Sequence, residues 1–147
     1  MKIVDITTIV VNAQMRNWVF VKVVTDQPGL YGWGEATLEW KTRAVVGTIE
    51  DLKPLILGRD PRDIEQIVRV LLKQSFWRLG VIGASAISGI EQALWDILGK
   101  SLDQPVWRLL GDECARGSRS TRISVSGTWR WSTKRSSRTR WQTAPSS

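Results

Sequence analysis

The sequence predicts an α+β domain over residues 1–111, in which a three-stranded antiparallel meander is followed by a helical bundle. Three observations lead to this prediction. Alternating and β-branched apolar residues fill much of the first 38 positions, apolar residues at helical spacing follow from position 42, and turn residues separate the segments. Residues 112–147 have a different composition, and we expect them to lie outside this domain.

The first three apolar segments are predicted strands. Residues 3–11 are rich in β-branched side chains, and residues 18–25 place a row of valines on one side of the strand. An Asp-Gln-Pro-Gly turn at 26–29 leads into a third strand at 30–38. Two glycines in this strand indicate bending or the close approach of another backbone. Consecutive strands with a tight turn between the last two favour an antiparallel meander.

Helical spacing of apolar residues then predicts four helices, at 42–55, 61–72, 85–98 and 105–110. Thr42 and Asp60 are the candidate caps of the first two helices, and Pro61 is the predicted first residue of the second. Gly58 and Gly99 are the predicted stops of the first and third helices. The order of strands and then helices favours helices packed on one face of a small sheet.

The composition excludes several kinds of site. The chain has 147 residues, 42% of them hydrophobic, which is enough for one domain with a core. It contains no histidine, which excludes a Ser-His-Asp triad and any histidine metal ligand, and its single cysteine, Cys114, makes no intrachain disulfide. No apolar run is long enough to span a membrane and no signal peptide begins at Met1, so we expect a cytoplasmic protein with no membrane partner.

The net charge of +7 conceals two different compositions. Residues 1–113 contain 13 Lys or Arg and 14 Asp or Glu, whereas residues 114–147 contain 8 Lys or Arg and no acid. The basic segment is also rich in Ser, Thr and Trp and poor in aliphatic residues, which is typical of disorder. We therefore place a boundary near Gly111 and expect residues 112–147 to form a disordered tail.

Three motifs in the predicted domain are informative together. They are Gly-Trp-Gly-Glu-Ala at 32–36, Ser-Ala-Ile-Ser-Gly-Ile-Glu-Gln-Ala-Leu-Trp-Asp-Ile at 85–97, and Pro-Val-Trp-Arg-Leu-Leu-Gly at 105–111. In this order, they resemble three segments of the enolase superfamily, in the branch of mandelate racemase and muconate-lactonizing enzyme. These are the third strand, a helix of the capping domain, and the segment that leads from this domain into the barrel. Phe-Trp-Arg at 76–78 and the turn at 58–61 tilt the resemblance toward galactonate-dehydratase-type sugar-acid dehydratases.

This resemblance implies that residues 1–111 are the N-terminal capping domain of a two-domain enzyme. Such a domain closes over the C-terminal face of a TIM-like barrel, where Mg²⁺ held by barrel carboxylates stabilises an enediolate after a base removes the proton α to a carboxylate. The metal ligands and the base lie on later barrel strands. We therefore expect the barrel to be missing, and the chain itself to hold no catalytic residue, metal ligand or cofactor and to be inactive. Dehydration of a sugar acid is the expected parent reaction, with racemisation or cycloisomerisation as alternatives.

Capping domains of this family supply substrate-specificity loops, which by position are residues 13–17 and 37–41. A loop after a strand can reach a ligand, and arginines can bind a substrate carboxylate with two hydrogen bonds, although exposed arginines without a function are at least as common. The candidate substrate-binding residues are Arg16, Trp18, Glu39, Trp40, Lys41 and Arg78. The expected partners of the parent are its own barrel, a sugar-acid substrate and a second copy of the chain.

Other prominent side chains have structural interpretations. Glu35 is interpreted as a carboxylate that joins strand to helix, and Glu91 and Asp96 as members of ion pairs on a helix face or between domains. Trp33 and Trp77 could line a pocket, but a place in the core or an interface is the default for tryptophan.

Beyond Gly111 the sequence departs from the family, which continues with Gly, then Val-Arg and the first barrel strand. Restoring one nucleotide before the Cys114 codon turns every Trp codon of the tail into Met, Leu or Val. With permissible codon choices it also yields Val-Arg, a strand, a Gly turn and an amphipathic helix. The forced aliphatic residues at Trp129, Trp131 and Trp141 fall on apolar positions of that helix. We therefore interpret residues from Cys114 onward as frameshifted sequence.

Two non-enzymatic interpretations stand beside this one. The mixture of Arg and Trp in the tail could grip phosphates and stack on single-stranded bases, although we expect no specific nucleic-acid partner. Alternatively, residues 1–111 could be a free-standing interaction module. That module would need polar surfaces where the barrel would otherwise sit, and we expect instead uncovered apolar faces and a tendency to aggregate.

Overall fold

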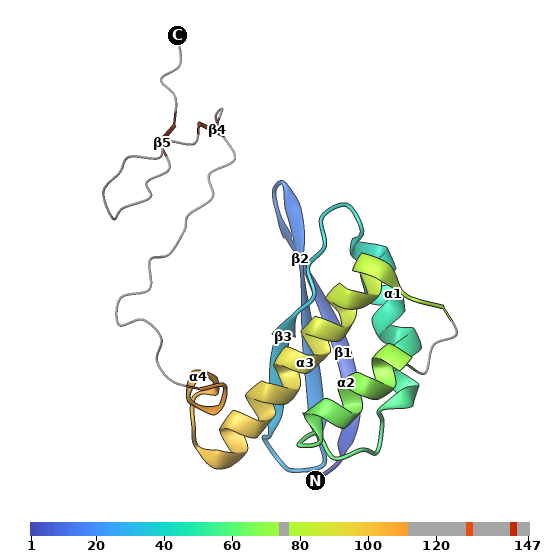
Figure 1. The fold of residues 1–147 in the computed structure, drawn as a ribbon, viewed down its shortest axis with the longest axis vertical. Helices are drawn as coiled ribbons and strands as arrows, with labels where there is room; N and C mark the ends of the chain where they lie inside the picture. Colours follow the sequence, from blue (N-terminus) through green and yellow to red (C-terminus); the bar gives the residue numbers. More distant parts are fainter. Residues whose placement is uncertain (74–76, 112–128, 131–141, 144–147) are drawn as a thin grey trace. The chain divides into compact units, whose positions relative to one another are not determined.

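The structure, a computed structural model, describes residues 1–73, 77–111, 129–130 and 142–143 (Figure 1). The chain divides into two compact units, Met1–Glu113 and Cys114–Ser147. In the second unit, β4 (Trp129–Arg130) pairs antiparallel with β5 (Gln142–Thr143). The disorder predicted for residues 112–147 otherwise falls on residues outside the described ones.

The first unit contains the predicted meander. Its strands are β1 (Ile3–Ala13), β2 (Arg16–Thr25) and β3 (Tyr31–Glu35), and the sheet order is β1-β2-β3 with both pairs antiparallel. The third strand ends before the predicted position. The Ala36 N–H still donates to the Val19 carbonyl, but the Val19 N–H donates to the Thr37 hydroxyl at 3.0 Å. A side chain therefore takes the place of the next backbone partner, and the chain leaves the sheet.

The helices lie on one face of this sheet (Figure 1), so the predicted α+β class and the order of elements are confirmed. They are α1 (Thr42–Leu52), the 3₁₀ turn η1 (Lys53–Leu55), α2 (Ile64–Lys73), α3 (Gly80–Leu102) and α4 (Val106–Leu109). Buried Ile, Val, Leu and Ala side chains form a single core between the sheet and the helices. Most of them belong to β1, β2, α1, α2 and α3. None of the described helices is long and apolar enough to cross a membrane.

The first helix begins and ends differently from the prediction. Thr42 is its first helical residue, whereas Lys41 occupies the cap position and makes no side-chain cap hydrogen bond. The helix ends at Leu52, well before Gly58, because Pro54 has no amide hydrogen with which to continue an α-helix. The chain continues as the 3₁₀ turn, and Gly58 follows with a φ of 78°, which glycine adopts without strain.

Helix α3 is longer at both ends than the predicted 85–98. It passes Gly99, the expected stop, because this glycine serves packing instead: a Cβ there would lie 2.7 Å from the carbonyl oxygen of Gln104. The helix ends at Leu102, and Asp103 follows in the left-handed conformation with a φ of 51°. Asp103 closes the helix with backbone hydrogen bonds to preceding carbonyls, as glycine does at many helix ends.

Helix α3 also lies unusually close to strand β3. A Cβ on Gly32 would be 1.9 Å from the carbonyl oxygen of Ala93, and a Cβ on Gly34 would be 1.9 Å from that of Gly89. Neither position has room for a side chain, because the obstacle is rigid helix backbone. The two glycines in this strand are therefore required by the close approach of helix to strand that their sequence pattern indicated.

The same helix closes the outer edge of β3 with polar side chains. Asp96 accepts a hydrogen bond from the Trp33 N–H at 2.9 Å, and Gln92 accepts one from the Glu35 N–H at 3.1 Å. Lys100 donates to the carbonyl of Tyr31 at 2.9 Å and pairs with Asp96 at 2.6 Å. Backbone groups that would otherwise be open to strand addition are thus occupied. The joint at Glu35 is made by its backbone, so the predicted role of its carboxylate is wrong.

The turn before α2 is organised by an ion pair. The prediction that Asp60 and Pro61 begin the second helix is wrong. They form a turn in which the Asp63 N–H donates to the Asp60 carbonyl at 3.1 Å, and α2 starts three residues after Pro61. The Arg62 guanidinium contacts both carboxylate oxygens of Asp60, the shortest contact being 2.6 Å. These hydrogen bonds from Arg62 lower the pKa of Asp60 from 3.8 to about 2.

This depressed pKa makes the stability of the domain depend on pH in acid. The Asp60 carboxylate stabilises the fold above its ordinary pKa of 3.8, and this contribution is lost as the pH falls toward about 2. Because the pair is partly exposed, we expect it to contribute less than about 1 kcal/mol. In urea unfolding at several pH values, the free energy of unfolding should fall less between pH 4 and 2 for Asp60→Asn than for the wild type. Asp51→Asn, on the exposed side of α1, should follow the wild type, and parallel curves for all three proteins would contradict the assignment.

The contact between β3 and α3 predicts a large difference between two glycine substitutions. Gly34→Ala places a Cβ against helix backbone, so we expect it to lower the free energy of unfolding by about 3 kcal/mol or more. Gly47→Ala, on the exposed face of α1 with nothing within 4 Å of the new Cβ, should raise it by up to about 1 kcal/mol. Urea unfolding followed by circular dichroism measures both. Equal stabilities of the two variants would show that the helix does not sit where described.

Candidate functional site

The β1–β2 hairpin and the loop between β3 and α1 lie side by side (Figure 1), and residues of both line a cleft of about 530 Å³. Both segments expected to carry substrate specificity contribute to it: residues 14–17 line one wall, and Trp40 and Lys41 line the other together with residues 42–44 at the start of α1. Eight polar or aromatic side chains line it: Asn12, Gln14, Arg16, Asn17, Trp40, Lys41, Thr42 and Arg43.

The hairpin wall is a rigid extension of the sheet. Only Gln14 and Met15 lie between the two strands, so the wall is tighter than the loop predicted at 13–17. Gln14 adopts a φ of 60° in this turn. The Asn12 side chain fixes the turn, since it accepts a hydrogen bond from the Gln14 N–H at 3.3 Å and donates to the Asn17 side chain at 3.0 Å.

An ion pair joins the two walls. The Arg16 guanidinium donates to the Glu39 carboxylate at 2.8 Å, and its carbon lies 5.4 Å from the ring centre of Trp18. The two charged side chains are 28% and 46% exposed, so the pair contributes little to stability. It does restrict the rotamers of Arg16. A side chain held in this way loses less entropy when it binds a ligand.

Trp40 holds a strained position in the loop wall. Its φ is 63°, in the left-handed region that costs a bulky residue on the order of 1 kcal/mol or more. The side chain is 87% exposed, so packing inside the domain does not compensate for this strain. Strained residues of this kind cluster at ligand sites. Trp40 is thus a strained and exposed residue in the lining of the cleft.

Positive charge dominates the cleft. Arg16, Lys41 and Arg43 line it, while the nearby carboxylate of Glu39 already accepts a hydrogen bond from Arg16. Guanidinium and ammonium groups are donors that suit carboxylates, and the amides of Asn12 and Gln14 add neutral donors and acceptors. The arrangement favours a small, polar, anionic ligand.

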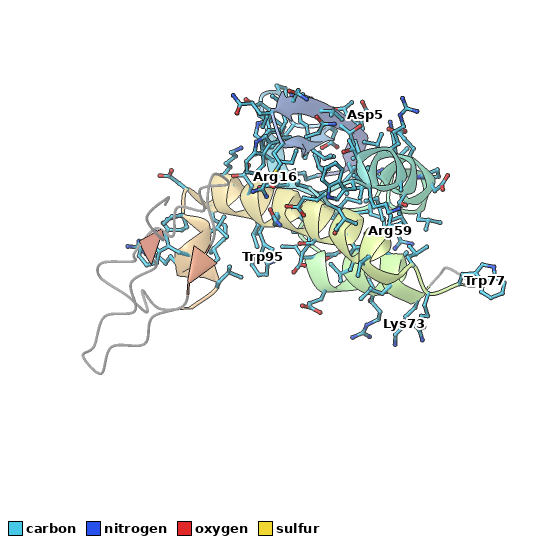
Figure 2. The ribbon with its side chains drawn as sticks, turned by 90° about the horizontal axis from the view of Figure 1, so that it is seen from above. Asp5, Arg16, Arg59, Lys73, Trp77 and Trp95 are labelled. Carbon is cyan, nitrogen blue, oxygen red and sulfur yellow. The ribbon has the colours of Figure 1, made fainter. Side chains whose placement is uncertain are left out.

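Five of the six predicted site residues lie together. Glu39, Trp40 and Lys41 meet Arg16 across the cleft, and Trp18 lies beneath Arg16. Arg78 is separate: it lines a smaller cleft of about 140 Å³ formed with residues of α2 and the start of α3. Figure 2 accordingly shows Arg16 and Trp77, the sequence neighbour of Arg78, on different sides of the domain.

Sequence reasoning missed the four cleft residues outside the two predicted loops, which are Asn12, Thr42, Arg43 and Ala44. Asn12 carried no signal beyond its place beside a turn. Arg43 did carry one, because it is a basic residue in the first turn of α1, where a helix dipole disfavours positive charge. A positive charge at a helix start lowers the stability of the helix, so a residue kept there despite this cost is a candidate for ligand binding.

The structural interpretations of other side chains are confirmed in part. Asp96 forms the expected ion pair on the helix face, whereas Glu91 accepts a hydrogen bond from the Trp95 indole at 3.4 Å. Trp33 and Trp77 lie outside the core, since they are 38% and 75% exposed.

The described residues do not suit a magnesium ion. Among them, no group of three or more His, Cys, Asp or Glu side chains is arranged to hold a metal. The carboxylate nearest the cleft, Glu39, is engaged by a guanidinium, which competes with a cation for its oxygens.

Comparison with known proteins places the domain in a family. Residues 3–111 match the mandelate racemase / muconate lactonizing enzyme N-terminal domain. Over 112 residues the chain is 45% identical to a D-galactonate dehydratase family member of Cellvibrio japonicus, and over 111 residues it is 43% identical to the D-galactonate dehydratase of Verminephrobacter eiseniae. Each alignment covers 76% of this chain but only 27% and 28% of the relative.

Solved structures show the same relationship. An enolase from Pantoea ananatis with bound D-gluconate and Mg is 40% identical, with a TM-score of 0.73, over 77% of this chain and 28% of that protein. A member of the enolase superfamily from Salmonella Typhimurium is 37% identical, with a TM-score of 0.72, over 78% of this chain and 30% of that protein. The chain therefore belongs to the enolase superfamily and contains the N-terminal domain of the mandelate racemase and muconate lactonizing enzyme family, in a form similar to that of galactonate dehydratases.

Proposed function

We propose that residues 1–111 cap the active site of a Mg²⁺-dependent sugar-acid dehydratase, and that the cleft between hairpin and loop binds oxygen atoms of the substrate. The observation that carries this proposal is the meeting of the two walls around Arg16 and Lys41 in one cationic cleft. The similarity to D-galactonate dehydratases and to an enolase with bound D-gluconate and Mg supports an acid sugar as the ligand class.

In this proposal each cleft residue has a distinct task. Arg16 donates hydrogen bonds to a carboxylate or hydroxyl oxygen of the sugar acid, and Glu39 keeps its guanidinium in place. Lys41 adds a second positive charge from the opposite wall. The exposed ring of Trp40 covers the ligand and helps to exclude water.

Removal of the α-proton and binding of Mg²⁺ belong, in this proposal, to a barrel domain that the capping domain must meet. The described carboxylates are unsuited to the ion, so the capping residues only bind and orient. The chain of 147 residues alone should accordingly show no turnover of acid sugars.

We further propose that residues from Cys114 onward are encoded in a shifted reading frame. The change from a net charge of −1 over residues 1–113 to +8 over residues 114–147 supports this, as does the end of the family match at position 111. The nucleotide sequence around the Cys114 codon tests it. One restored nucleotide should open a frame that begins with Val-Arg and continues into a strand and an amphipathic helix, and a frame interrupted by early stop codons would contradict the proposal.

A domain exchange tests the capping function. Residues 1–111 would replace the corresponding domain of the Verminephrobacter eiseniae D-galactonate dehydratase, to which they are 43% identical. We expect the hybrid to turn over an acid sugar in the presence of Mg²⁺, and the 147-residue chain alone to remain at the level of a metal-free control. In the hybrid, Arg16→Ala should lower kcat/KM roughly tenfold to a hundredfold, because a charged hydrogen bond to substrate is lost.

The matched control for that exchange is Arg69→Ala, which removes an exposed arginine from α2 and should leave kcat/KM unchanged. Equal activity of the Arg16→Ala and Arg69→Ala hybrids would remove Arg16 from the site. Turnover by the 147-residue chain alone would contradict the assignment of catalysis to a barrel.

A further inference from the structure

The smaller cleft that contains Arg78 lies between the end of α2 and the start of α3, two helices that lie side by side (Figure 1). Its volume is about 140 Å³. Leu71 of α2 and Ile87 of α3 line it and are only 1% and 5% exposed. These two side chains belong to the core of the domain, so the cleft has an aliphatic floor.

One wall of this cleft is fixed by packing against a glycine. The Gly83 N–H donates to the Leu79 carbonyl at 3.2 Å, and a Cβ added at Gly83 would lie 1.9 Å from the Cβ of Leu79. Leu79 therefore occupies the space that any other residue at position 83 would need. Its side chain is held beside the floor and adds to the apolar lining.

Arg78 is the single charged side chain among the described residues that line this cleft. It is exposed, and it takes part in none of the four ion pairs found in the described part of the chain. The neighbouring sequence supplies no acid, because residues 66–90 contain Arg69, Lys73 and Arg78 but no Asp or Glu. The cleft thus combines an aliphatic floor with a guanidinium that has no carboxylate partner among the described residues.

The size and the charge of the cleft together define a class of ligand. An apolar cavity of about 150 Å³ holds one molecule of the size of benzene. A guanidinium binds a carboxylate with two parallel hydrogen bonds. A bare inorganic anion would leave the aliphatic floor unused, and a neutral hydrocarbon would leave the guanidinium unpaired. A compact apolar group that carries one carboxylate satisfies both parts of the cleft.

We propose that this cleft binds a small monocarboxylic acid whose apolar group is about the size of a benzene ring. The apolar group packs against Leu71 and Ile87, and the carboxylate accepts hydrogen bonds from Arg78. Because the cleft is small and Arg78 and Leu72 at its rim are exposed, we expect a dissociation constant of about 1 mM. Binding here involves no residue of the cationic cleft, so it is independent of the proposed capping function.

Titration of the full chain with sodium benzoate at constant ionic strength, followed by amide chemical shifts in NMR spectra, measures this binding. The amide signals of Gly80, Gly83 and Ala84 should shift and saturate with a dissociation constant of about 1 mM. Benzyl alcohol has the ring without the charge, and acetate has the charge without the ring. Each should bind at least about tenfold more weakly than benzoate.

Two variants test the two parts of the cleft separately. Arg78→Gln removes the charge and should weaken benzoate binding about tenfold or more. Ala84→Leu puts a larger side chain at an exposed position of the lining, fills the cleft and should cause a similar loss. Matched controls are Arg69→Gln and Gln66→Leu, at exposed positions of α2 outside the lining, and both should bind benzoate like the wild type.

Circular dichroism melts of every variant separate loss of fold from loss of binding. Absence of a saturable shift with benzoate up to about 20 mM would overturn the proposal. So would shifts confined to residues of the cationic cleft, or benzoate binding that either Arg78→Gln or Ala84→Leu leaves unaltered in a folded protein.

Discussion

Helix α3 reaches strand β3 only because Gly32 and Gly34 present no side chain to it. The carbonyl oxygens of Ala93 and Gly89 occupy the space that a Cβ would need, 1.9 Å away in each case. This distance brings the polar face of the helix to the edge of the strand, where Gln92 and Asp96 reach the backbone. Small residues in the strand and polar residues in the helix are thus two parts of one contact, in which close packing makes hydrogen bonding possible.

This contact determines where the candidate site lies. Once α3 fixes β3, the chain leaves the sheet at Thr37, whose hydroxyl accepts the last ladder hydrogen bond from Val19. Only six residues, 36–41, separate β3 from α1, and this loop comes back beside the hairpin, where Glu39 meets Arg16. One wall of the cleft is therefore the rigid β1–β2 hairpin, and the other wall contains the strained residue Trp40.

Much of this arrangement could be predicted from the sequence, and the failures have physical causes. Periodicity predicted the three strands and the helix at 85–98 correctly, because burial follows the strand and helix repeats. Helix ends were predicted less well: Pro54 ended α1 early, Pro61 formed a turn, and Gly99 served packing. Local residue preferences do not reveal which of these roles a proline or glycine takes, since tertiary contacts decide it.

The candidate site was predicted as two loops, and their meeting depends on register. A one-residue shift of β2 against β1 would turn Arg16 to the other face of the sheet and away from Glu39, which sequence spacing alone cannot decide. Arg78 illustrates the opposite outcome, because its place after α2 carries it to a different cleft. The shared location of Arg16, Glu39, Trp40 and Lys41 is thus a property of the folded sheet.

The central claim is that this cleft holds oxygen atoms of a sugar acid beneath a capping domain. A crystal structure of the hybrid enzyme with D-gluconate and Mg²⁺ tests it most directly. The account predicts a guanidinium nitrogen of Arg16 within about 3.2 Å of an oxygen of the ligand, with Glu39 still paired to Arg16. A bound ligand with no atom within hydrogen-bonding distance of either Arg16 or Lys41 would contradict it.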